Sequence, residues 1–354
     1  MLWPLLVAFG LVARNVEATH TLRFACSQLV IERLDPLVNP GANPSPHMHQ
    51  IVGGNAFNTT MDPALDIGDS STCTTCSFSE DFSNYWTAVL YFRARNGTFK
   101  RVPQLANQNI ETAEGGMTVY YISPDDRNSS LVAFQRGFRM LAGTAERRTR
   151  DSAFVNLFRC YDGYDEKMNY RPNPMGVAAS DTTELPTRHC AGGVRVNTFF
   201  PTCWDGVNLD SPDHKTHVAY PVQGVFGNCP KSHPVEIPQV FIETIWDTGK
   251  FDQSLWPDDG SQPFVFSQGD PTGFGHHADY VFGWKGDSLQ KAMDARCDVF
   301  DARPDPIIHP ASECPQLRTQ EQAVANECSK RQTAQEDIDA WIPTLPGGMP
   351  ITYK

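Results

Sequence analysis

Histidines gather in four short segments of this 354-residue chain, and imidazole is the side chain best suited to metal ligation and to proton transfer near neutral pH. The segments read PHMHQ, SPDHKTHVAYP, KSHPVEI and GDPTGFGHHADY. Each lies among Gly, Pro, Asp or Ser, which are residue types of turns and loops. Loops carried on a rigid sheet often hold binding and catalytic side chains, so these segments are the first candidates for a site.

The spacing within two of these segments favours a shared ligand. In an extended segment the two rings of His47-x-His49 project to one face, and His214-x-x-His217 does the same on a helical turn. We therefore predict one site lined by all four rings, with one divalent ion, copper, zinc or manganese, as its candidate cofactor. The alternative for each pair is a loop histidine that is hydrogen-bonded to a backbone carbonyl.

The densest run of polar chemistry is FFPTCWDGVNLDSPDHKTHVAYP, residues 199–221. A carboxylate beside a histidine can fix the imidazole tautomer, and a nearby tyrosine can act as an acid or a base. These are the groups that proton transfer or metal ligation requires. The residues predicted to be catalytic are His47, His49, His214, His217, Asp213 and Tyr220.

Tryptophans beside Gly, Asp or Pro suggest a second kind of contact, because an aromatic face next to polar groups is suited to holding a sugar ring. The alternative is that these tryptophans pack in the core, where most large aromatic side chains lie. The residues predicted to contact substrate are Trp204, Asp205, Trp256, His276 and Asp279.

The N-terminus indicates export. The apolar run from residue 2 to residue 12 has the length of a signal peptide and is too short to span a bilayer. Val16 and Ala18 fit the small-x-small rule of signal peptidase. Residues 1–18 are therefore predicted to be a signal peptide, and the mature protein is predicted to be secreted and extracellular.

The cysteines agree with export, because all ten follow the predicted cleavage point and an even number in an oxidising compartment usually forms disulfides. Cys73 and Cys76, whose spacing in a cytosolic protein would suggest zinc or redox chemistry, are interpreted as two structural half-cystines. Sequons at Asn58, Asn96 and Asn128 also favour a secretory route and predict a glycoprotein.

The net charge of −12 excludes some partners. An acidic chain without a basic stripe is unsuited to nucleic acid and to an anionic membrane surface. No second apolar run of spanning length follows, and the chain ends in the polar ITYK, so neither a membrane span nor a lipid anchor is predicted. The motifs of common serine hydrolases, zinc proteases and nucleotide-binding proteins are missing from the sequence.

Short apolar runs dominate the chain up to about residue 285, for example YWTAVLYF, MTVYYI, VNTFFP and QVFIETIW. Gly, Pro, Asn and Asp interrupt them every dozen or so residues, which is typical of antiparallel strands. We therefore predict a mostly β fold, an antiparallel β-sandwich or jelly-roll-like domain stabilised by disulfides. One secreted β-rich domain is assigned to residues 19–315.

Helix signals are confined to the C-terminal part. The segment DSLQKAMDARCDVF follows a candidate N-cap at Asp287 or Ser288 and has apolar residues at helical spacing. A second candidate is TQEQAVANECSKRQTAQEDIDAW, predicted to lie on the sandwich and to be bridged from Cys328 to Cys314. Residues 316–354 are therefore predicted to form a peripheral helix and an extended tail.

Five long segments, between about residue 24 and about residue 314, carry a resemblance to a known family. They are RLDPLVNPGANPSPHMHQIVGGNAF, CTTCSFSEDFSNYWTAVLYF, GFRMLAG, FFPTCWDGVNLDSPDHKTHVAYP and QPFVFSQGDPTGFGHHADYVFGW. The chain resembles the fungal secreted family known as domain of unknown function nineteen ninety-six, whose members sometimes carry sugar-binding WSC modules. The resemblance implies a fungal origin, secretion and a single disulfide-containing domain, and it implies no activity.

The resemblance also implies that the polar motif positions matter. These positions are His47, His49, Asp205, Asp210, Asp213, His214, His217, His233, Asp270 and Asp279. His277 departs from the family pattern, in which a small residue is expected after Gly-Phe-Gly-His. We therefore interpret His277 as peripheral to any site.

Three functions remain open from sequence alone. The first is an enzyme with a groove lined by histidine and aspartate that acts on cell-wall polysaccharide, either as a lyase or as a metal-assisted hydrolase. The second is a non-catalytic carbohydrate- or cell-wall-binding protein whose histidines hold a structural metal. The third is an extracellular structural or interaction protein without a site.

Overall fold

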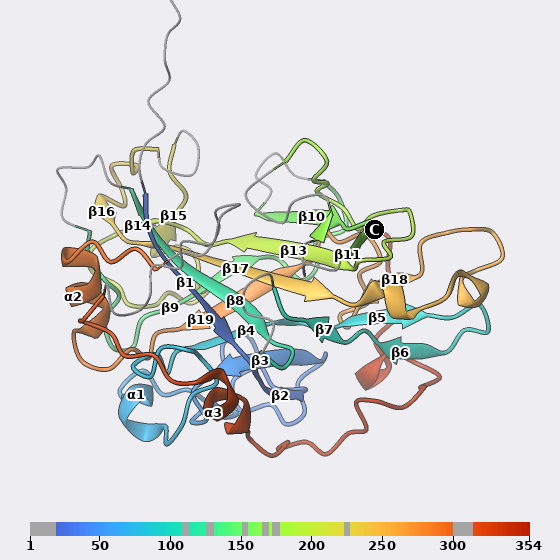
Figure 1. Ribbon diagram of the computed structural model, residues 1–354, viewed down its shortest axis with the longest axis horizontal. Helices are drawn as coiled ribbons and strands as arrows, with labels where there is room; N and C mark the ends of the chain where they lie inside the picture. The colour runs from blue at the N-terminus through green and yellow to red at the C-terminus, as the bar shows by residue number, and fades with distance from the viewer. Residues whose placement is uncertain are drawn as a thin grey trace, which may run out of the picture.

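Antiparallel strands are the main regular structure of the chain, as predicted, and the helices are few and short (Figure 1). The computed structural model describes residues 19–107, 113–124, 131–150, 155–164, 170–171, 178–222, 227–299 and 314–354. The predicted signal peptide, residues 1–18, lies outside these ranges.

Two main sheets form the body of the protein. The first has the order β1-β8-β17-β13-β10, with β7 paired to β17. Its strands are β1 (Thr19–Cys26), β7 (Gln104–Leu105), β8 (Met117–Pro124), β10 (Asn156–Cys160), β13 (Val194–Phe199) and β17 (Gln239–Trp246). The second has the order β2-β3-β4-β19-β9. Its strands are β2 (Gln28–Glu32), β3 (His49–Gly53), β4 (Asn84–Ala88), β9 (Arg139–Gly143) and β19 (His277–Val281).

Three small sheets and short helices complete the fold. The small sheets contain β5 (Leu90–Arg93), β6 (Phe99–Arg101) and β18 (Phe264–Phe266); β14 (Cys203–Trp204), β15 (Val218–Ala219) and β16 (Val235–Glu236); and β11 (Gly163–Tyr164) with β12 (Tyr170–Arg171). The helices are α1 (Ile67–Ser70), α2 (Ser288–Asp294), α3 (Gln322–Glu327) and the 3-10 turns η1 (Thr248–Lys250), η2 (Gln253–Leu255) and η4 (Pro346–Gly348).

The main core lies between the two sheets, so the protein is a β-sandwich. Alternate residues of each strand point into it, as the period of two requires. The first sheet contributes Phe24, Val119, Tyr121, Val240 and Ile242, and the second contributes Val52, Tyr85, Met140, Ala278 and Tyr280. All ten side chains are buried.

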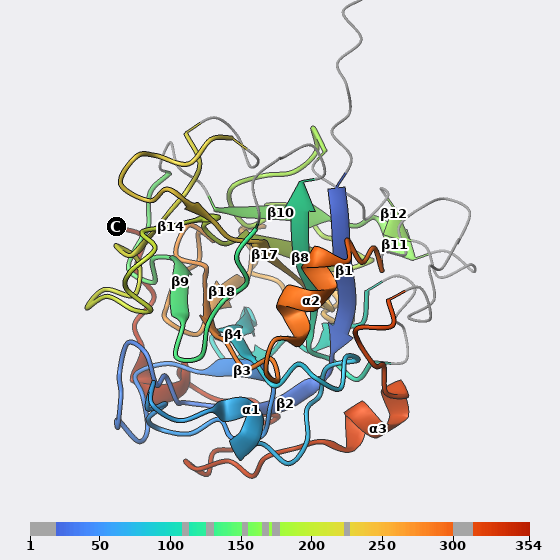
Figure 2. The ribbon, with the colours of Figure 1, turned by 90° about the vertical axis from the view of Figure 1, so that its left-hand side faces the viewer.

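The outer face of the second sheet is also covered. The segment between β2 and β3 folds back over this face, and its Leu34 and Leu37 pack with Ile51, Trp86 and Val281 of the sheet. Figure 2 shows α1 and α3 on the side of β2 and β3 that faces away from β8 and β17. Polar side chains on this outer face are therefore shielded from solvent.

The inner core contains a polar network that ends at a buried carboxylate. Asp81 accepts hydrogen bonds from the Ser83 backbone N–H and the Tyr85 hydroxyl, each at 2.9 Å. The hydroxyls of Tyr85, Tyr121 and Tyr280 continue the chain at 2.7 and 2.9 Å. Burial raises the pKa of Asp81 to about 7, although these hydrogen bonds favour the ionised form.

Asp81 is expected to make stability depend on pH. Its folded pKa exceeds the unfolded value of about 4, so the stabilisation is complete below pH of about 4 and is lost as pH rises to about 7. The loss is at most about 4 kcal/mol. Asp81→Asn should remove this pH dependence, which chemical denaturation between these two pH values would measure. An unchanged slope in the variant would contradict the assignment.

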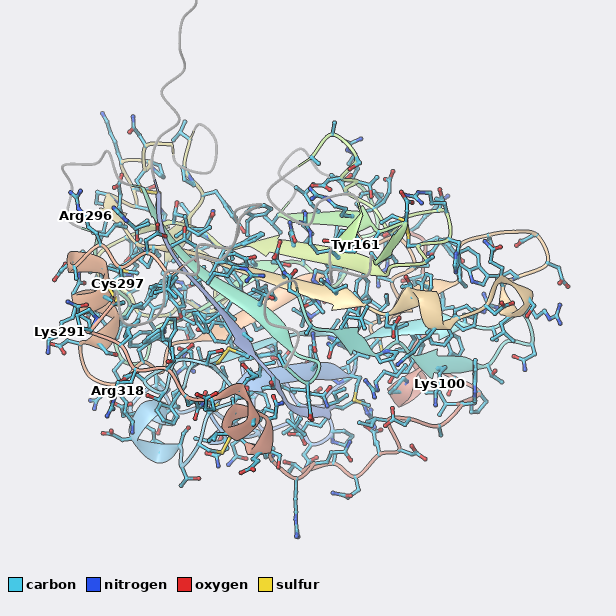
Figure 3. All side chains as sticks on the ribbon, viewed as in Figure 1. Lys100, Tyr161, Lys291, Arg296, Cys297 and Arg318 are labelled. Atoms are coloured by element: carbon cyan, nitrogen blue, oxygen red, sulfur yellow. A yellow bond between two sulfur atoms is a disulfide. The ribbon has the colours of Figure 1, made fainter. Side chains whose placement is uncertain are left out.

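All ten cysteines are paired. The disulfides are Cys26–Cys76, Cys73–Cys328, Cys160–Cys190, Cys203–Cys229 and Cys297–Cys314, the last beside α2, where Cys297 is labelled in Figure 3. The interpretation of Cys73 and Cys76 as structural half-cystines is confirmed. Five disulfides indicate an extracellular or secreted protein, because such bonds persist in oxidising compartments.

The predicted bridge from Cys328 to Cys314 is wrong, because α3 is attached to a different part of the chain. The Gln320 side chain donates hydrogen bonds to the carbonyls of Thr74 and Cys76, which brings Cys328 to Cys73. Cys314 is bonded to Cys297.

The second predicted helix is also shorter than its pattern suggested. α3 covers six residues, and the chain beyond it is extended. The polar side chains there bind the edge of the second sheet instead of forming helical contacts. Lys330 donates to Glu32 at 3.1 Å, and Arg33 forms an ion pair with Glu336 at 2.7 Å. The helix that begins behind Asp287 is confirmed as α2.

Two of the three predicted sequons can be located. Asn58 and Asn96 are exposed, as glycosylation requires, and Asn128 lies outside the described ranges.

No helix in the described part of the chain has both the length and the apolar character needed to cross a bilayer.

Candidate metal centre

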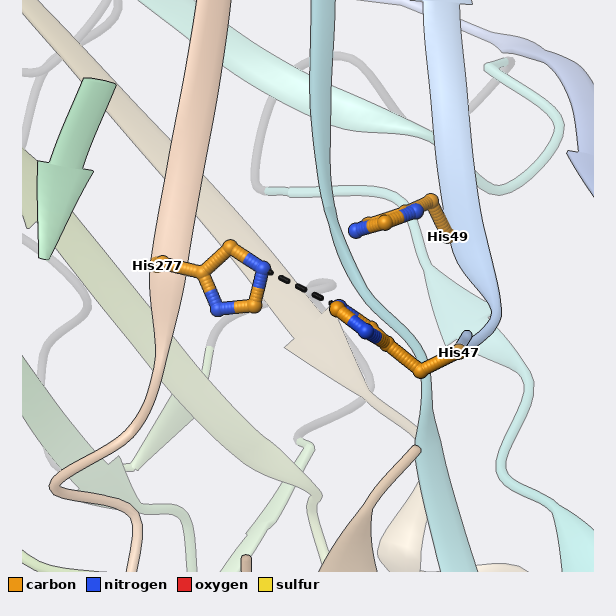
Figure 4. Close-up of side chains that lie close together, drawn as sticks. All are labelled: His47, His49 and His277. Atoms are coloured by element: carbon orange, nitrogen blue, oxygen red, sulfur yellow. Dashed lines mark hydrogen bonds between the residues drawn. The ribbon is translucent and has the colours of Figure 1, made fainter. Parts of the chain in front are cut away.

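Two histidines of the second sheet lie on its outer face with one strand between them. His49 of β3 pairs with Ala88 of β4. The pairing of Ala278 with Thr87 brings His277 of β19 to the level of Ala88 on the other side. Directly paired residues of antiparallel strands point to the same face, so the two imidazoles flank the small Ala88 side chain. Figure 4 shows the two rings leaning toward each other across the intervening strand.

His47 adds a third ring from the turn that precedes β3. Its Nε2 atom lies 3.3 Å from Nε2 of His277, and its ring centroid lies 4.3 Å from that of His49. One nitrogen from each of the three rings lies within 4.8 Å of the other two. We call these three residues the histidine centre (Figure 4).

Backbone carbonyls hold two rings of the histidine centre in a defined tautomer. Nδ1 of His49 lies 2.9 Å from the Leu34 carbonyl oxygen, and Nδ1 of His277 lies 3.0 Å from that of Gly275. A carbonyl oxygen only accepts, so both Nδ1 atoms carry the proton and both Nε2 atoms present a lone pair. This arrangement is typical of metal-ligating histidines.

One of the three nitrogen–nitrogen distances suits a tetrahedral ion. Bonds of about 2.0–2.1 Å from a tetrahedral ion place two ligand nitrogens about 3.3–3.4 Å apart. The Nε2 atoms of His47 and His277 are 3.3 Å apart, and without an ion this contact is a hydrogen bond from Nε2–H of His47 to Nε2 of His277 (Figure 4). Nε2 of His49 has no hydrogen-bond partner among the described residues.

The rings are buried and neutral. His47, His49 and His277 are 8, 0 and 2% exposed. Burial, followed by the charges of the neighbouring rings, lowers the pKa of His47 well below its usual value. Burial lowers the pKa of His49 to about 4, although Asp35 opposes the shift. The Nε2 lone pairs of His49 and His277 are therefore available near neutral pH, and His47 offers its own once its proton moves to Nδ1.

The loop before β19 has a local reason for its shape. In the segment Asp270-Pro-Thr-Gly-Phe-Gly, the buried Asp270 carboxylate accepts hydrogen bonds from the backbone N–H groups of Thr272, Gly273 and Gly275. Gly273 has a φ of +90°, which favours glycine. The loop thereby fixes the carbonyl of Gly275 that orients His277.

Charged groups surround the histidine centre. Asp279 follows His277 by two residues, on the same face of β19, and is fully buried. Neither of its oxygens has a hydrogen-bond partner in the part of the chain that the structure describes. Burial raises the pKa of Asp279 well above its usual value, Asp35 adds to this, and Lys215 opposes it. The Lys215 ammonium donates to the carbonyl of Gly143, which pairs with His277, at 2.6 Å.

His214 and His217 do not join the histidine centre. Nδ1 of His214 lies 2.6 Å from the Asp210 carboxylate and Nε2 lies 3.0 Å from the Leu37 carbonyl. The two nitrogens of His217 contact the Ser211 hydroxyl at 2.9 Å and the Arg139 carbonyl at 2.8 Å. The prediction that both rings ligate an ion together with His47 and His49 is wrong, because all four nitrogens have other partners. Two of these partners lie in the same loop, and the carbonyls of Leu37 and Arg139 anchor the loop to the rest of the fold.

Asp213 and Tyr220 have similar structural roles. The Asp213 carboxylate accepts from the backbone N–H groups of Lys215 and Thr216 and from the Ser211 hydroxyl. The Tyr220 hydroxyl donates to the Phe199 carbonyl at 2.8 Å. These contacts fold the 211–220 loop and do not place either group beside the three rings.

Most of the predicted substrate contacts lie elsewhere in the fold. Trp204 and Trp256 are 6 and 8% exposed and pack in two different hydrophobic clusters, so their faces are not free to hold a sugar. Asp205 accepts from the N–H groups of Val207 and Asn208 and closes a turn.

His276 is likewise enclosed. Its ring packs beside Phe158 and Phe266, and burial lowers its pKa to about 3. Of the five residues predicted to contact substrate, Asp279 alone lies on the same sheet face beside the histidine centre.

The interpretation of His277 as peripheral is wrong, because its Nε2 atom is part of the histidine centre. The signal that identifies it is the alternation His277-x-Asp279, since a strand puts both side chains on one face. Ala88 carries no such signal, because only the pairing of β3, β4 and β19 shows that it lies between the rings. Asp35 carries none either, because it lies in the segment between β2 and β3 that folds back over the sheet.

A second group of possible ligand atoms, Cys26, Cys76 and Asp81, does not form a metal site. The two sulfurs are bonded to each other, so neither is a thiolate.

The fold and the histidine centre together define a disulfide-stabilised β-sandwich with three converging imidazoles on one covered sheet face. The family model of the domain of unknown function DUF1996 matches residues 35–284, so the chain belongs to this family. The matched range contains all three rings, Asp35, Ala88, Lys215 and Asp279. In the comparisons with curated proteins and with solved structures, nothing matched.

Proposed function

We propose that the protein binds one divalent transition-metal ion through the Nε2 atoms of His47, His49 and His277. The observation that carries this proposal is the convergence of three buried, neutral rings, two of which have their Nδ1–H groups held by carbonyls. Without an ion, Nε2 of His49 is a buried acceptor with no described partner, which is costly.

The donor set narrows the choice of ion. Imidazole nitrogens suit zinc and copper, whereas manganese prefers carboxylate and water oxygens. Among the three candidate ions, the histidine centre therefore favours zinc or copper.

The burial of the rings favours an ion that is held in place. This supports the non-catalytic alternative, a secreted carbohydrate- or cell-wall-binding protein that carries a metal. A metal-assisted hydrolase acting on cell-wall polysaccharide is the second candidate, and the buried carboxylate of Asp279 beside the centre favours it.

The first test is elemental analysis of protein secreted without a histidine tag and purified without chelator. About one equivalent of zinc or copper is expected, because three converging imidazoles form one site. Titration of the stripped protein with Zn²⁺ and Cu²⁺ should give the same stoichiometry. Failure to bind either ion after reconstitution would refute the proposal.

The second test separates the two candidate roles. Metal-loaded and stripped protein would be incubated with insoluble chitin, glucan and pectin. Retention on a polymer without soluble product would support the binding role, and product formed only by the loaded protein would support the hydrolase. Neither retention nor product on all three polymers would count against a polysaccharide partner.

A further inference from the structure

We infer that the histidine centre takes a hydrated ion, with one water as its fourth ligand and the Asp279 carboxylate as the acceptor of a hydrogen bond from that water. This inference rests on the proposed metal site and adds a fourth coordination position. It assigns a task to a buried carboxylate that the fold does not explain.

The position of Asp279 suits a contact through water. Residues two apart on one strand face have Cα atoms about 6.6–6.8 Å apart. Among the described residues, the set of mutually close ligand atoms contains the three rings and does not include Asp279. A carboxylate on this face that lies outside the group of mutually close ligand atoms is compatible with a contact through one water.

The bonding state of Asp279 also points to a missing donor. The side chain is 0% exposed, and neither oxygen has a hydrogen-bond partner in the described ranges. Buried carboxylates elsewhere in this fold are satisfied, for example Asp270, which accepts from the backbone of its own loop. A water polarised by a cation is a strong donor to a carboxylate, so it would supply what Asp279 lacks.

The local charges leave room for a cation. Asp35 is fixed beside the centre by the backbone N–H groups of Leu37 and Val38, and its charge acts on His49, His277 and Asp279. Lys215 is a cation that acts on both Asp279 and His277. Asp35 is therefore a fixed anion that would favour a cation among the three rings.

The residue of β4 that lies between the rings has a small side chain. Ala88 is the residue between His49 and His277, and its methyl group is the smallest side chain that a non-glycine residue offers. A larger side chain at this position would stand between the two flanking rings. The proposed ion and its water would lie over Ala88, toward the side chain of Asp279.

The test compares Asp279→Asn with the wild type. The matched control is Asp81→Asn, the same change at a buried carboxylate of the inner face that already has hydrogen-bond partners. In the metal-free state Asp279→Asn should stay folded, because the amide has nearly the same size and shape as the carboxyl group. The same variant should bind Zn²⁺ with one equivalent and a dissociation constant about 10–100-fold weaker, the effect of losing a partner of a metal ligand. Asp81→Asn should leave the dissociation constant unchanged.

A second measurement tests the water itself. Azide added to the Cu²⁺-loaded wild type should produce a charge-transfer absorption band, because azide displaces an exchangeable water. If the wild type binds metal but shows no azide band, or if Asp279→Asn binds as tightly as wild type, this inference is refuted and the three-histidine site stands. If the wild type binds no metal, the proposed function fails first.

Discussion

His277→Asn is expected to abolish metal binding while the protein stays folded. Asparagine retains a donor near the position of Nδ1, which can keep the contact with the Gly275 carbonyl, and it has no atom at the position of Nε2. One of three ligands is therefore removed with little other change. Bound metal should fall from about one equivalent to near zero. The affinity for metal should fall by more than roughly 100-fold, which is the upper end of the effect of removing a group hydrogen-bonded to a metal ligand.

The matched control is His214→Asn, the same chemical change at a histidine that also has both nitrogens in contact. This variant should keep the contact with Asp210 and lose the hydrogen bond to the Leu37 carbonyl, at a cost of about 1 kcal/mol. Its metal content should equal that of the wild type. Elemental analysis and thermal unfolding of both variants would decide the matter. Metal loss in His214→Asn together with retention in His277→Asn would reverse the assignment of the two segments.

This contrast shows what the histidine segments do and do not reveal about the site. His47-x-His49 was found from its spacing, because a period of two is a local property of extended chain. The third ring is 230 residues away from His47 along the chain and reaches it through the pairing of β3, β4 and β19. No local pattern specifies which strands become neighbours.

The segment SPDHKTHVAYP shows the opposite error. Its density of polar side chains suggested catalysis, but Asp210, Asp213 and the two histidines satisfy one another and nearby backbone groups. A short irregular loop has many backbone donors and acceptors outside any ladder, and polar side chains are the usual partners for them. What this segment brings to the histidine centre is Lys215, whose ammonium lies at the carbonyl of Gly143.

The sandwich itself followed from alternation and turn residues, because the apolar runs are long and the interruptions are regular. The structure of the C-terminal region could not be predicted in this way. Its polar residues fit either a solvated helix or an extended segment bound to the edge of a sheet. Glu32 at the edge of β2 decides this, since its carboxylate accepts from the Lys330 ammonium and the Thr333 backbone. These contacts depend on tertiary structure and leave no periodic signal.

Ala88→Leu is expected to abolish metal binding although every ligand is still present. The Ala88 side chain lies between the rings of His49 and His277, on the face where their Nε2 atoms converge. Leucine at this position would occupy the volume that the ion needs and would push the rings apart. Structural zinc sites bind with about 10–16 kcal/mol, so a variant that cannot accommodate the ion also loses the associated rise in melting temperature.

The control for this change is a size series at the same position. Ala88→Ser adds one atom and should keep one equivalent of metal, whereas Ala88→Val should bind more weakly and Ala88→Leu should not bind. Overpacking costs typically about 1–3 kcal/mol, so thermal unfolding of the metal-free variants must accompany the titrations. A folded Ala88→Leu protein that binds zinc with the wild-type dissociation constant would show that the ion does not lie above β4. If metal affinity instead falls as the side chain at position 88 grows, the ion lies above β4, because all three imidazoles are intact in every variant of the series.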